Sequence, residues 1–238
     1  MRLDTALVER SLASSRNRAA RLIAERRVRV NGTTATKASL NVSDADIIEA
    51  DAERWVSRAA YKLFGALDQA GIVVPPRVLD AGASTGGFTQ VCLERGAHRV
   101  YAVDVGHGQL VPQLREDSRV VVHEGLNLRD LQLAHLDDEP VDLVVGDVSF
   151  ISLTLLLEPL FAVCRGTALL LVKPQFEVGR EKLGVGGIVA DEREREHAVE
   201  HVIDAAAQLG WEPWWRGTSA LPGMHGNIEV FLAMRSSG

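Results

Sequence analysis

The sequence predicts an α/β protein in which a mainly parallel sheet of about seven strands, covered by helices on both faces, follows a small basic α+β domain. Three observations support this prediction. From Val56 onward, short apolar runs alternate with helical patterns, as in parallel sheets that are buried on both faces. Basic residues gather near the N-terminus, and 238 residues suffice for one medium and one small domain.

Charge divides the chain into two parts. The net charge is −6, yet residues 1–37 carry nine Arg or Lys and three acids, which leaves 17 of the 26 basic and 29 of the 32 acidic residues to residues 38–238. A basic module on an acidic body predicts nucleic-acid binding by the module, with a solvated basic helix face as the alternative.

Composition excludes several classes of protein. With 46% hydrophobic and 24% charged residues the chain is globular. Its charge-free stretch at 148–157 is about half as long as a membrane span, and the N-terminus has no apolar signal core, so we expect a cytoplasmic protein. Cys92 and Cys164 fall in apolar segments, which favours core positions over a disulfide or a metal site. No metal is expected.

The first domain is expected to span residues 1–50. Ser14 or Ser15 can cap a helix that runs to about Arg26. One face of that helix is apolar and the other is basic; the apolar positions are Ala19, Leu22 and Ile23, and the basic positions are Arg18 and Arg21. A short strand, Val28–Val30, precedes Asn31-Gly32, a dipeptide that favours a tight hairpin because both residues tolerate positive φ.

A linker is expected at 51–57 and a second domain at 58–238. Trp55, the aromatic residue of the linker, either packs into the core of one domain or couples the two. In the second domain the expected strands are Arg77–Asp80, Arg99–Asp104, Arg119–His123, Val141–Asp147, Thr167–Lys173, Trp211–Ser219 and Ile228–Met234, and a helix is expected at Asp191–Leu209. Ligands of such sheets bind beyond the carboxyl ends of the strands.

A glycine-rich loop follows the first of these strands, in the sequence DAGASTGGFT. Its spacing is not that of the dinucleotide fingerprint, and no lysine follows as in a phosphate loop. Together with Asp104, an acid at the end of the second strand that could bind ribose hydroxyls, the loop predicts an S-adenosylmethionine site. The expected cofactor-binding residues are Asp80, Gly82, Ser84, Thr85, Gly86, Gly87, Phe88, Asp104, Asn127 and Asp147.

Four charged residues are predicted on the same rim of the sheet; they are Lys62, Asp147, Lys173 and Glu229. Each could belong to a structural ion pair. Lys173 differs from the rest because it ends a strongly apolar strand and precedes Pro174, which forces the chain to leave in an extended conformation.

The N-terminal pattern RLD..L......SR..A..LI....V.VNG resembles the S4-type RNA-binding domain over about 50 residues. The one departure is Arg26-Arg27, where a glycine is common. We expect the arginines of this domain to contact RNA phosphates; they are Arg2, Arg16, Arg18, Arg21, Arg26, Arg27 and Arg29.

Almost the whole chain resembles the TlyA or hemolysin A-like family, through the motifs SRAAYKL, LDAGASTGGFT, DVGHGQL, DLVVGDVSFISL, LLLVKPQFEVGR and PGMHGNIEVFL. The resemblance implies a ribosomal RNA 2′-O-methyltransferase with an S4-type domain and an FtsJ-like, Rossmann-like catalytic domain that uses S-adenosylmethionine. It also implies a Lys-Asp-Lys-Glu catalytic set, matched here by Lys62, Asp147, Lys173 and Glu229. His107 and the PGMHGN turn depart from the usual pattern.

The expected reaction is an in-line attack of a cytidine ribose 2′-hydroxyl on the donor methyl group, with Lys173 beside that hydroxyl as either a base or a charged orienter. The expected partner is ribosomal RNA in ribosomal subunits or assembly intermediates. Family members that methylate both subunits carry extra basic residues before the first domain and a C-terminal tail, so the sequence favours the large subunit and leaves the small one open.

Three alternatives from other classes of protein remain. A hemolysin-type cytolysin needs an insertion segment, which the sequence lacks. A non-catalytic RNA-binding assembly factor would share the first domain, and only binding and transfer assays separate it from an enzyme. A small-molecule methyltransferase would leave residues 1–37 without a role.

Overall fold

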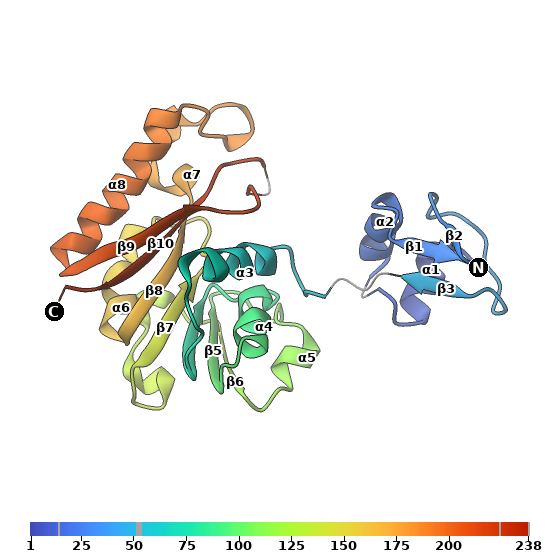
Figure 1. Cartoon of the computed structure of the whole chain (residues 1–238), viewed down its shortest axis with the longest axis horizontal. Coiled ribbons are helices and arrows are strands. Elements are labelled where there is room, and N and C mark those ends of the chain that lie inside the picture. Colours follow the sequence, from blue (N-terminus) through green and yellow to red (C-terminus); the bar gives the residue numbers. More distant parts are fainter. Residues whose placement is uncertain (14, 51–53, 224, 238) are drawn as a thin grey trace. The chain divides into compact units, whose positions relative to one another are not determined.

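The computed structural model describes residues 1–13, 15–50, 54–223 and 225–237 (Figure 1). Through their internal contacts these residues form two compact units, Met1–Arg54 and Trp55–Gly238. Part of the linker expected at 51–57 lies outside the described residues, namely 51–53. Trp55 is buried in the core of the second unit and packs against Phe64 at a ring-centroid distance of 5.7 Å, so the structure gives it a core position.

The first unit packs two helices on a three-stranded antiparallel sheet of order β2-β1-β3. Its elements are α1 (Leu3–Glu9), α2 (Arg16–Ala24), β1 (Val28–Val30), β2 (Thr33–Thr34) and β3 (Ile48–Ala50). Ser15 caps α2 by accepting a hydrogen bond from the Arg18 backbone N–H at 3.2 Å. The predicted hairpin is confirmed, because Asn31 and Gly32 both have positive φ, 51° and 78°.

The backbone conformation of Arg26 shows why glycine is common at this position of the S4 pattern. Its φ is +59°, in the left-handed region that glycine enters without steric cost. The turn between α2 and β1 keeps this conformation with an arginine in place.

The second unit contains a seven-stranded sheet of order β6-β5-β4-β7-β8-β10-β9. The first five strands in this order are parallel, and β10 is antiparallel to both of its neighbours. This confirms the predicted α/β fold class. The strands are β4 (Arg77–Ala81), β5 (Arg99–Asp104), β6 (Val120–Glu124), β7 (Val141–Gly146), β8 (Cys164–Val172), β9 (Trp211–Thr218) and β10 (Val230–Ser236).

Helices cover both faces of this sheet (Figure 1). On one face pack α3 (Ala59–Ala70) and α4 (Gly87–Glu94), and on the other α6 (Leu157–Ala162) and α8 (Glu192–Gln208). Two short helices, α5 (Pro112–Arg115) and α7 (Pro174–Glu177), follow β5 and β8 in the chain. Cys92 and Cys164 are free and buried, as expected of core residues.

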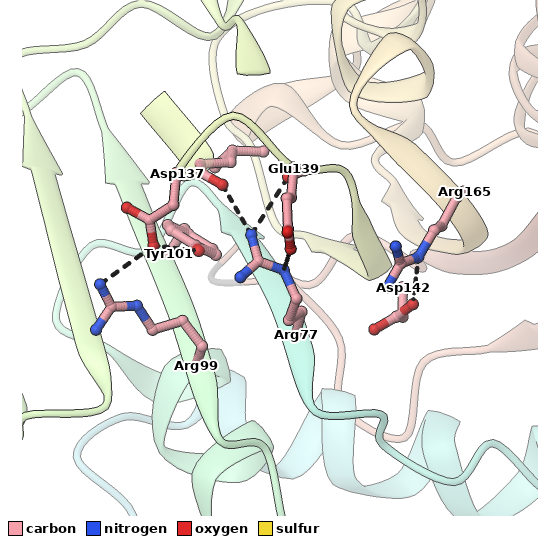
Figure 2. Close-up of polar contacts among 8 residues, drawn as sticks. Arg77, Arg99, Tyr101, Asp137, Glu139, Asp142 and Arg165 are labelled. Atoms are coloured by element: carbon pink, nitrogen blue, oxygen red, sulfur yellow. Dashed lines mark hydrogen bonds and ion pairs between the residues drawn. The ribbon is translucent and has the colours of Figure 1, made fainter. Parts of the chain in front are cut away.

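Arginine side chains near the amino ends of the parallel strands donate hydrogen bonds to nearby carbonyl and carboxylate oxygens (Figure 2). Arg77 donates to the Leu136 carbonyl at 2.8 Å, and Arg99 donates to the Asp137 carboxylate at 3.2 Å. The Arg165 side chain pairs with Asp142 across β8 and β7 at 2.7 Å. Arg77 and Arg99 thus tie the sheet to the loop before β7, and Arg165 joins two strands, all at the end opposite to the candidate site.

Candidate active site

The chain reverses its direction across the sheet between β4 and β7. From β4 it proceeds to β5 and β6 on one side, and it then returns to β7 and β8 on the other. Ligands of open α/β sheets bind at such a switch point, beyond the carboxyl ends of the strands. The glycine-rich loop after β4 and Asp147 after β7 both lie there.

Strand alternation explains why the charged residues share one face. Side chains two positions apart in a strand point to the same side. Val145, Leu171 and Phe231 are among the strand residues that pack under α3 and α4, and the charged residues two positions away from them are Asp147, Lys173 and Glu229. The apolar pattern therefore places these three charges on the face that α3 covers.

Lys62 and Glu229 form a buried ion pair. The Lys62 side chain, on α3, donates from Nζ to Oε2 of Glu229 at 2.6 Å, and the two residues are 9% and 2% exposed. Gln175 donates to the other carboxylate oxygen at 3.4 Å. A Cβ at Gly223 would lie 2.5 Å from that oxygen, so the absence of a side chain there leaves room for the carboxylate.

Lys173 and Asp147 form a second pair, with Nζ 2.5 Å from Oδ1. The pair is held by charge, because the geometry at Oδ1 does not meet that of a hydrogen bond. A directed hydrogen bond runs instead from Lys173 Nζ to the Ser149 hydroxyl, at 2.6 Å. The structure thus gathers the four charged residues into two amine–carboxylate pairs at one end of the sheet.

The loop glycines are required by the protein's own packing. Gly82 has a φ of +87°, and a Cβ there would lie 3.0 Å from the Asp147 carbonyl oxygen. A Cβ at Gly86 would collide with Leu110 and Leu114, and one at Gly87 with Ser57. A nearby ligand is therefore not needed to explain these glycines, because close packing of the loop against the ends of β7 and α3 and against the α5 segment accounts for them.

Asp80 lies beneath the loop. It is fully buried and accepts a hydrogen bond from the Thr89 hydroxyl of α4 at 2.6 Å. Burial raises the pKa of Asp80 to about 7, and the Thr89 hydrogen bond opposes this shift. The second carboxylate oxygen has no partner among the described residues. Asp80 thus anchors α4 rather than presenting its carboxylate to solvent.

The raised pKa of Asp80 predicts a pH-dependent stability. The folded state binds the proton more tightly than the unfolded chain, so the free energy of unfolding is expected to fall from about pH 4 to about pH 7. The Asp80→Asn substitution removes this contribution to the pH dependence of the free energy of unfolding. Urea unfolding at pH 5 and pH 8 should show the variant gaining stability relative to the unchanged protein at the higher pH. Parallel pH curves for the two proteins would contradict the assignment.

Asp104, at the end of β5, is the best-placed group for a ribose. Its two carboxylate oxygens accept backbone hydrogen bonds from Ser84 at 2.8 Å and Gly106 at 2.7 Å. These bonds fix the carboxylate, and each oxygen keeps a further lone pair for a ligand hydroxyl. Glu124 ends the neighbouring strand in register with Asp104, and the Arg115 hydrogen bond lowers its pKa to about 2. This pair of oriented carboxylates suits a sugar diol.

The remaining predicted cofactor residues lie in different surroundings. Ser84 is exposed with a φ of +47°, and its hydroxyl donates to Gln109. Thr85 is half-buried and accepts from the Val111 backbone through its carbonyl. Phe88 is buried in the core and stacks on Phe231. Asn127 caps a short helical turn by accepting from the Arg129 backbone N–H. The structure thus gives Phe88 a packing role and Asn127 a capping role.

Sequence reasoning missed several polar residues around the four charges. Ser149 and Gln175 contact Lys173 and Glu229 directly. Asn227, which is buried, accepts from the Val189 backbone and donates to the Gly187 carbonyl, and so holds the loop before α8. The signal that could have found Ser149 and Asn227 is their position, two residues from Asp147 and Glu229 respectively.

Of the N-terminal arginines predicted to bind RNA, some are paired with acidic residues and others are not. Asp4 accepts from Arg2 at 3.0 Å and from Arg16 at 3.1 Å, and it thereby orients two exposed guanidinium groups. Glu25 pairs with Arg21 and Arg27, and Arg18 also has an interaction partner. Arg26 and Arg29 are exposed, and no ion pair to either is found in the described part of the chain.

Among the described residues, no cluster of His, Cys, Asp or Glu could hold a metal ion. In the same residues no helix is long and apolar enough to cross a membrane.

A seven-stranded sheet with a glycine loop and an acidic strand end defines a Rossmann-like methyltransferase. Residues 55–236 match the FtsJ-like methyltransferase family, and residues 1–48 match the S4 domain. The 16S/23S rRNA (cytidine-2′-O)-methyltransferase TlyA of Mycobacterium tuberculosis is 49% identical over 99% of this chain and 90% of its own length. The 23S rRNA (cytidine-2′-O)-methyltransferase TlyA of Campylobacter jejuni is 36% identical over 97% of this chain and 98% of its own.

A solved structure described as a hemolysin from Streptococcus thermophilus shares 36% identity and superposes with a TM-score of 0.78, over 100% of this chain and 88% of that one. The chain belongs to the TlyA and hemolysin A-like family of FtsJ-like methyltransferases with an S4 domain.

Proposed function

We propose that this protein transfers a methyl group from S-adenosylmethionine to the ribose 2′-hydroxyl of a cytidine in ribosomal RNA. One observation carries the proposal: two amine–carboxylate pairs, the buried Lys62–Glu229 and the partly buried Lys173–Asp147, lie at the carboxyl end of the sheet. The names of the M. tuberculosis and C. jejuni relatives support a cytidine 2′-hydroxyl as the acceptor.

The carboxyl ends of β4 and β5 offer groups that fit the cofactor. Asp104 would accept the ribose hydroxyls, and the loop from Gly82 to Gly86 would border the methionine end. S-adenosylmethionine supplies an electrophilic methyl group, so that transfer forms an O2′–C bond, breaks the S–C bond with its electron pair left on sulfur, and releases the 2′-hydroxyl proton.

The four charged side chains would align the nucleophile and stabilise its charge. Alignment of reacting atoms at about 3–3.5 Å can contribute roughly 7–11 kcal/mol. Lys173 would meet the 2′-hydroxyl, held in place by Asp147. The Lys62–Glu229 pair would lie beside Lys173, because Glu229 directly precedes β10, whose first residue pairs with the last residue of β8. This assignment holds whether Lys173 takes the proton or orients the hydroxyl.

The S4 domain would supply the RNA affinity. Exposed arginines such as Arg26 and Arg29, and the pair oriented by Asp4, suit phosphates, whose binding weakens steeply with salt. Folded RNA is recognised mainly by shape and 2′-hydroxyls, so we propose that the substrate is a ribosomal subunit or an assembly intermediate in the cytoplasm. Both relatives' names include 23S rRNA, which makes the large subunit the first substrate to test and the small subunit the second.

The decisive experiment uses tritiated S-adenosylmethionine with large and small ribosomal subunits from a strain that lacks this protein. We expect about one methyl group per subunit, mapped to one cytidine ribose by reverse transcription at limiting nucleotide. Tight binding of the subunit without transfer would instead identify a non-catalytic assembly factor.

An Arg26→Ala/Arg29→Ala variant tests the RNA side in the same assay. We expect a higher KM for the subunit and a shallower dependence of binding on salt, because each lost phosphate contact reduces counterion release. Unchanged kinetics together with transfer to a small acceptor would favour a small-molecule methyltransferase.

A further inference from the structure

We propose that Ser149 is a positioning residue for methyl transfer, because its hydroxyl fixes the rotation of the Lys173 amine and so directs the amine at the acceptor hydroxyl. The inference rests on the proposed function and extends it to a residue outside the four charged positions.

Ser149 makes the directed contact to the Lys173 amine. Lys173 Nζ donates to Ser149 Oγ at 2.6 Å. The contact of Nζ with Asp147 Oδ1, although 2.5 Å long, does not have hydrogen-bond geometry. Asp147 therefore attracts the amine, whereas Ser149 determines how the amine is turned.

The geometry of the Lys173 amine makes its rotation about the Cε–Nζ bond important for contact with the acceptor hydroxyl. Nζ carries three positions besides its bond to Cε, occupied by three N–H groups in the charged form or by two N–H groups and a lone pair in the neutral form. When one position is fixed on Ser149 Oγ, rotation about the Cε–Nζ bond stops and the other two directions are set. The amine stays close to the Asp147 charge, and one of these two directions is available to the ribose hydroxyl.

The loop after β7 is built to present this hydroxyl. Val148 is buried in the core on the α6 and α8 face, whereas Asp147 and Ser149 on either side of it both contact the Lys173 amine. Phe150 then turns the chain with a φ of +67°, and the residue is 93% exposed. Residues with bulky side chains rarely adopt this conformation, and those that do cluster at functional sites.

Glu177 ties the same loop to the segment that carries Lys173. Its carboxylate accepts from the Ser152 hydroxyl at 2.6 Å and from the Leu153 backbone N–H at 2.8 Å. Glu177 lies in α7, which begins directly after Lys173. The loop and the α7 segment are thus joined at two places, by the Lys173–Ser149 contact and by the hydrogen bond from the Leu153 backbone N–H to Glu177, and the second contact does not depend on the Ser152 hydroxyl.

The test compares Ser149→Ala with Ser149→Thr, which keeps the hydroxyl. A hydrogen bond to a charged group corresponds to about 10- to 100-fold in rate, so kcat of Ser149→Ala is expected to fall by about that factor, with KM for the subunit and for S-adenosylmethionine changed less than about 3-fold. Ser149→Thr should recover most of the rate. Ser152→Ala, which removes a hydroxyl from the same loop but leaves the Leu153 contact with Glu177, should stay within about 2-fold of the unchanged protein.

A second measurement needs neither RNA nor methyl transfer. Competitive acetylation of the free protein, followed by mass spectrometry, reports how accessible and mobile the Lys173 amine is relative to the exposed Lys182. Labelling of Lys173 is expected to rise several-fold in Ser149→Ala and to stay near the unchanged value in Ser149→Thr and Ser152→Ala.

Unchanged kcat and unchanged labelling in Ser149→Ala would overturn the role of Ser149, as would an equal loss in Ser152→Ala or in Ser149→Thr. If the unchanged protein transfers no methyl group at all, the proposed function fails instead, and the labelling result still decides whether Ser149 holds Lys173.

Discussion

Replacing Lys173 by alanine is expected to lower the rate of methyl transfer by about 10²–10⁴-fold while cofactor binding stays close to that of the unchanged protein. The reason is position. Lys173 is 8% exposed, directly follows β8, and contacts Asp147 and Ser149, whereas Asp104, the group that suits the cofactor ribose, ends β5. Single-turnover transfer to large ribosomal subunits gives the rate, and calorimetric titration gives the affinity for S-adenosylmethionine.

Lys182→Ala is the matched control for this variant. Lys182 follows the same segment of chain, is well exposed, and pairs with Glu194, so its loss should leave the rate unchanged. Thermal unfolding must accompany both variants, because removing Lys173 leaves Asp147 without its cation. Wild-type turnover by a folded Lys173→Ala protein would remove this residue from the mechanism.

Removing either member of the Lys62–Glu229 pair is expected to cost about 3–5 kcal/mol of stability, because the other charge is then buried without a partner. The expectation applies to Lys62→Met and to Glu229→Leu, since both side chains are almost fully buried. The double variant removes both charges, and its stability should return close to that of the unchanged protein.

Activity measurements distinguish a purely structural role of the Lys62–Glu229 pair from a role in methyl transfer. If the pair only supports the fold, the double variant will transfer methyl groups at a normal rate once its stability has recovered. We expect the opposite, namely a stable double variant that binds S-adenosylmethionine and transfers slowly. Denaturant unfolding and the subunit assay, carried out on all four proteins, complete the double-mutant cycle.

Much of the fold could be predicted from the sequence because it depends on local pattern. The alternation of apolar runs and helical segments predicted the seven strands, and Asn31-Gly32 predicted the hairpin. Errors were confined to the ends of elements. β8 begins at Cys164 rather than Thr167, and β10 begins at Val230 rather than Ile228, because the ends of a strand depend on which neighbour offers hydrogen bonds.

The candidate site was harder to predict. The positions of Asp147, Lys173 and Glu229 at strand ends could be predicted, since alternation and apolar runs are visible in the sequence. Their pairing could not, because Lys62 and Glu229 are 167 residues apart in the chain and each could have paired with another charge. Charge counts also overstated the free arginines of the first domain, where Asp4 and Glu25 engage four of them.

The sequence by itself determined the two-part organisation, the mainly parallel sheet and the family, since periodicity, charge distribution and motifs are properties of the chain in order. Only the tertiary structure decided which amine meets which carboxylate, that the loop glycines pack against the protein's own atoms, and that Ser149 holds Lys173. These contacts join residues distant along the chain across distances of a few ångströms, and such distances are set by how the helices and strands pack rather than by any local pattern.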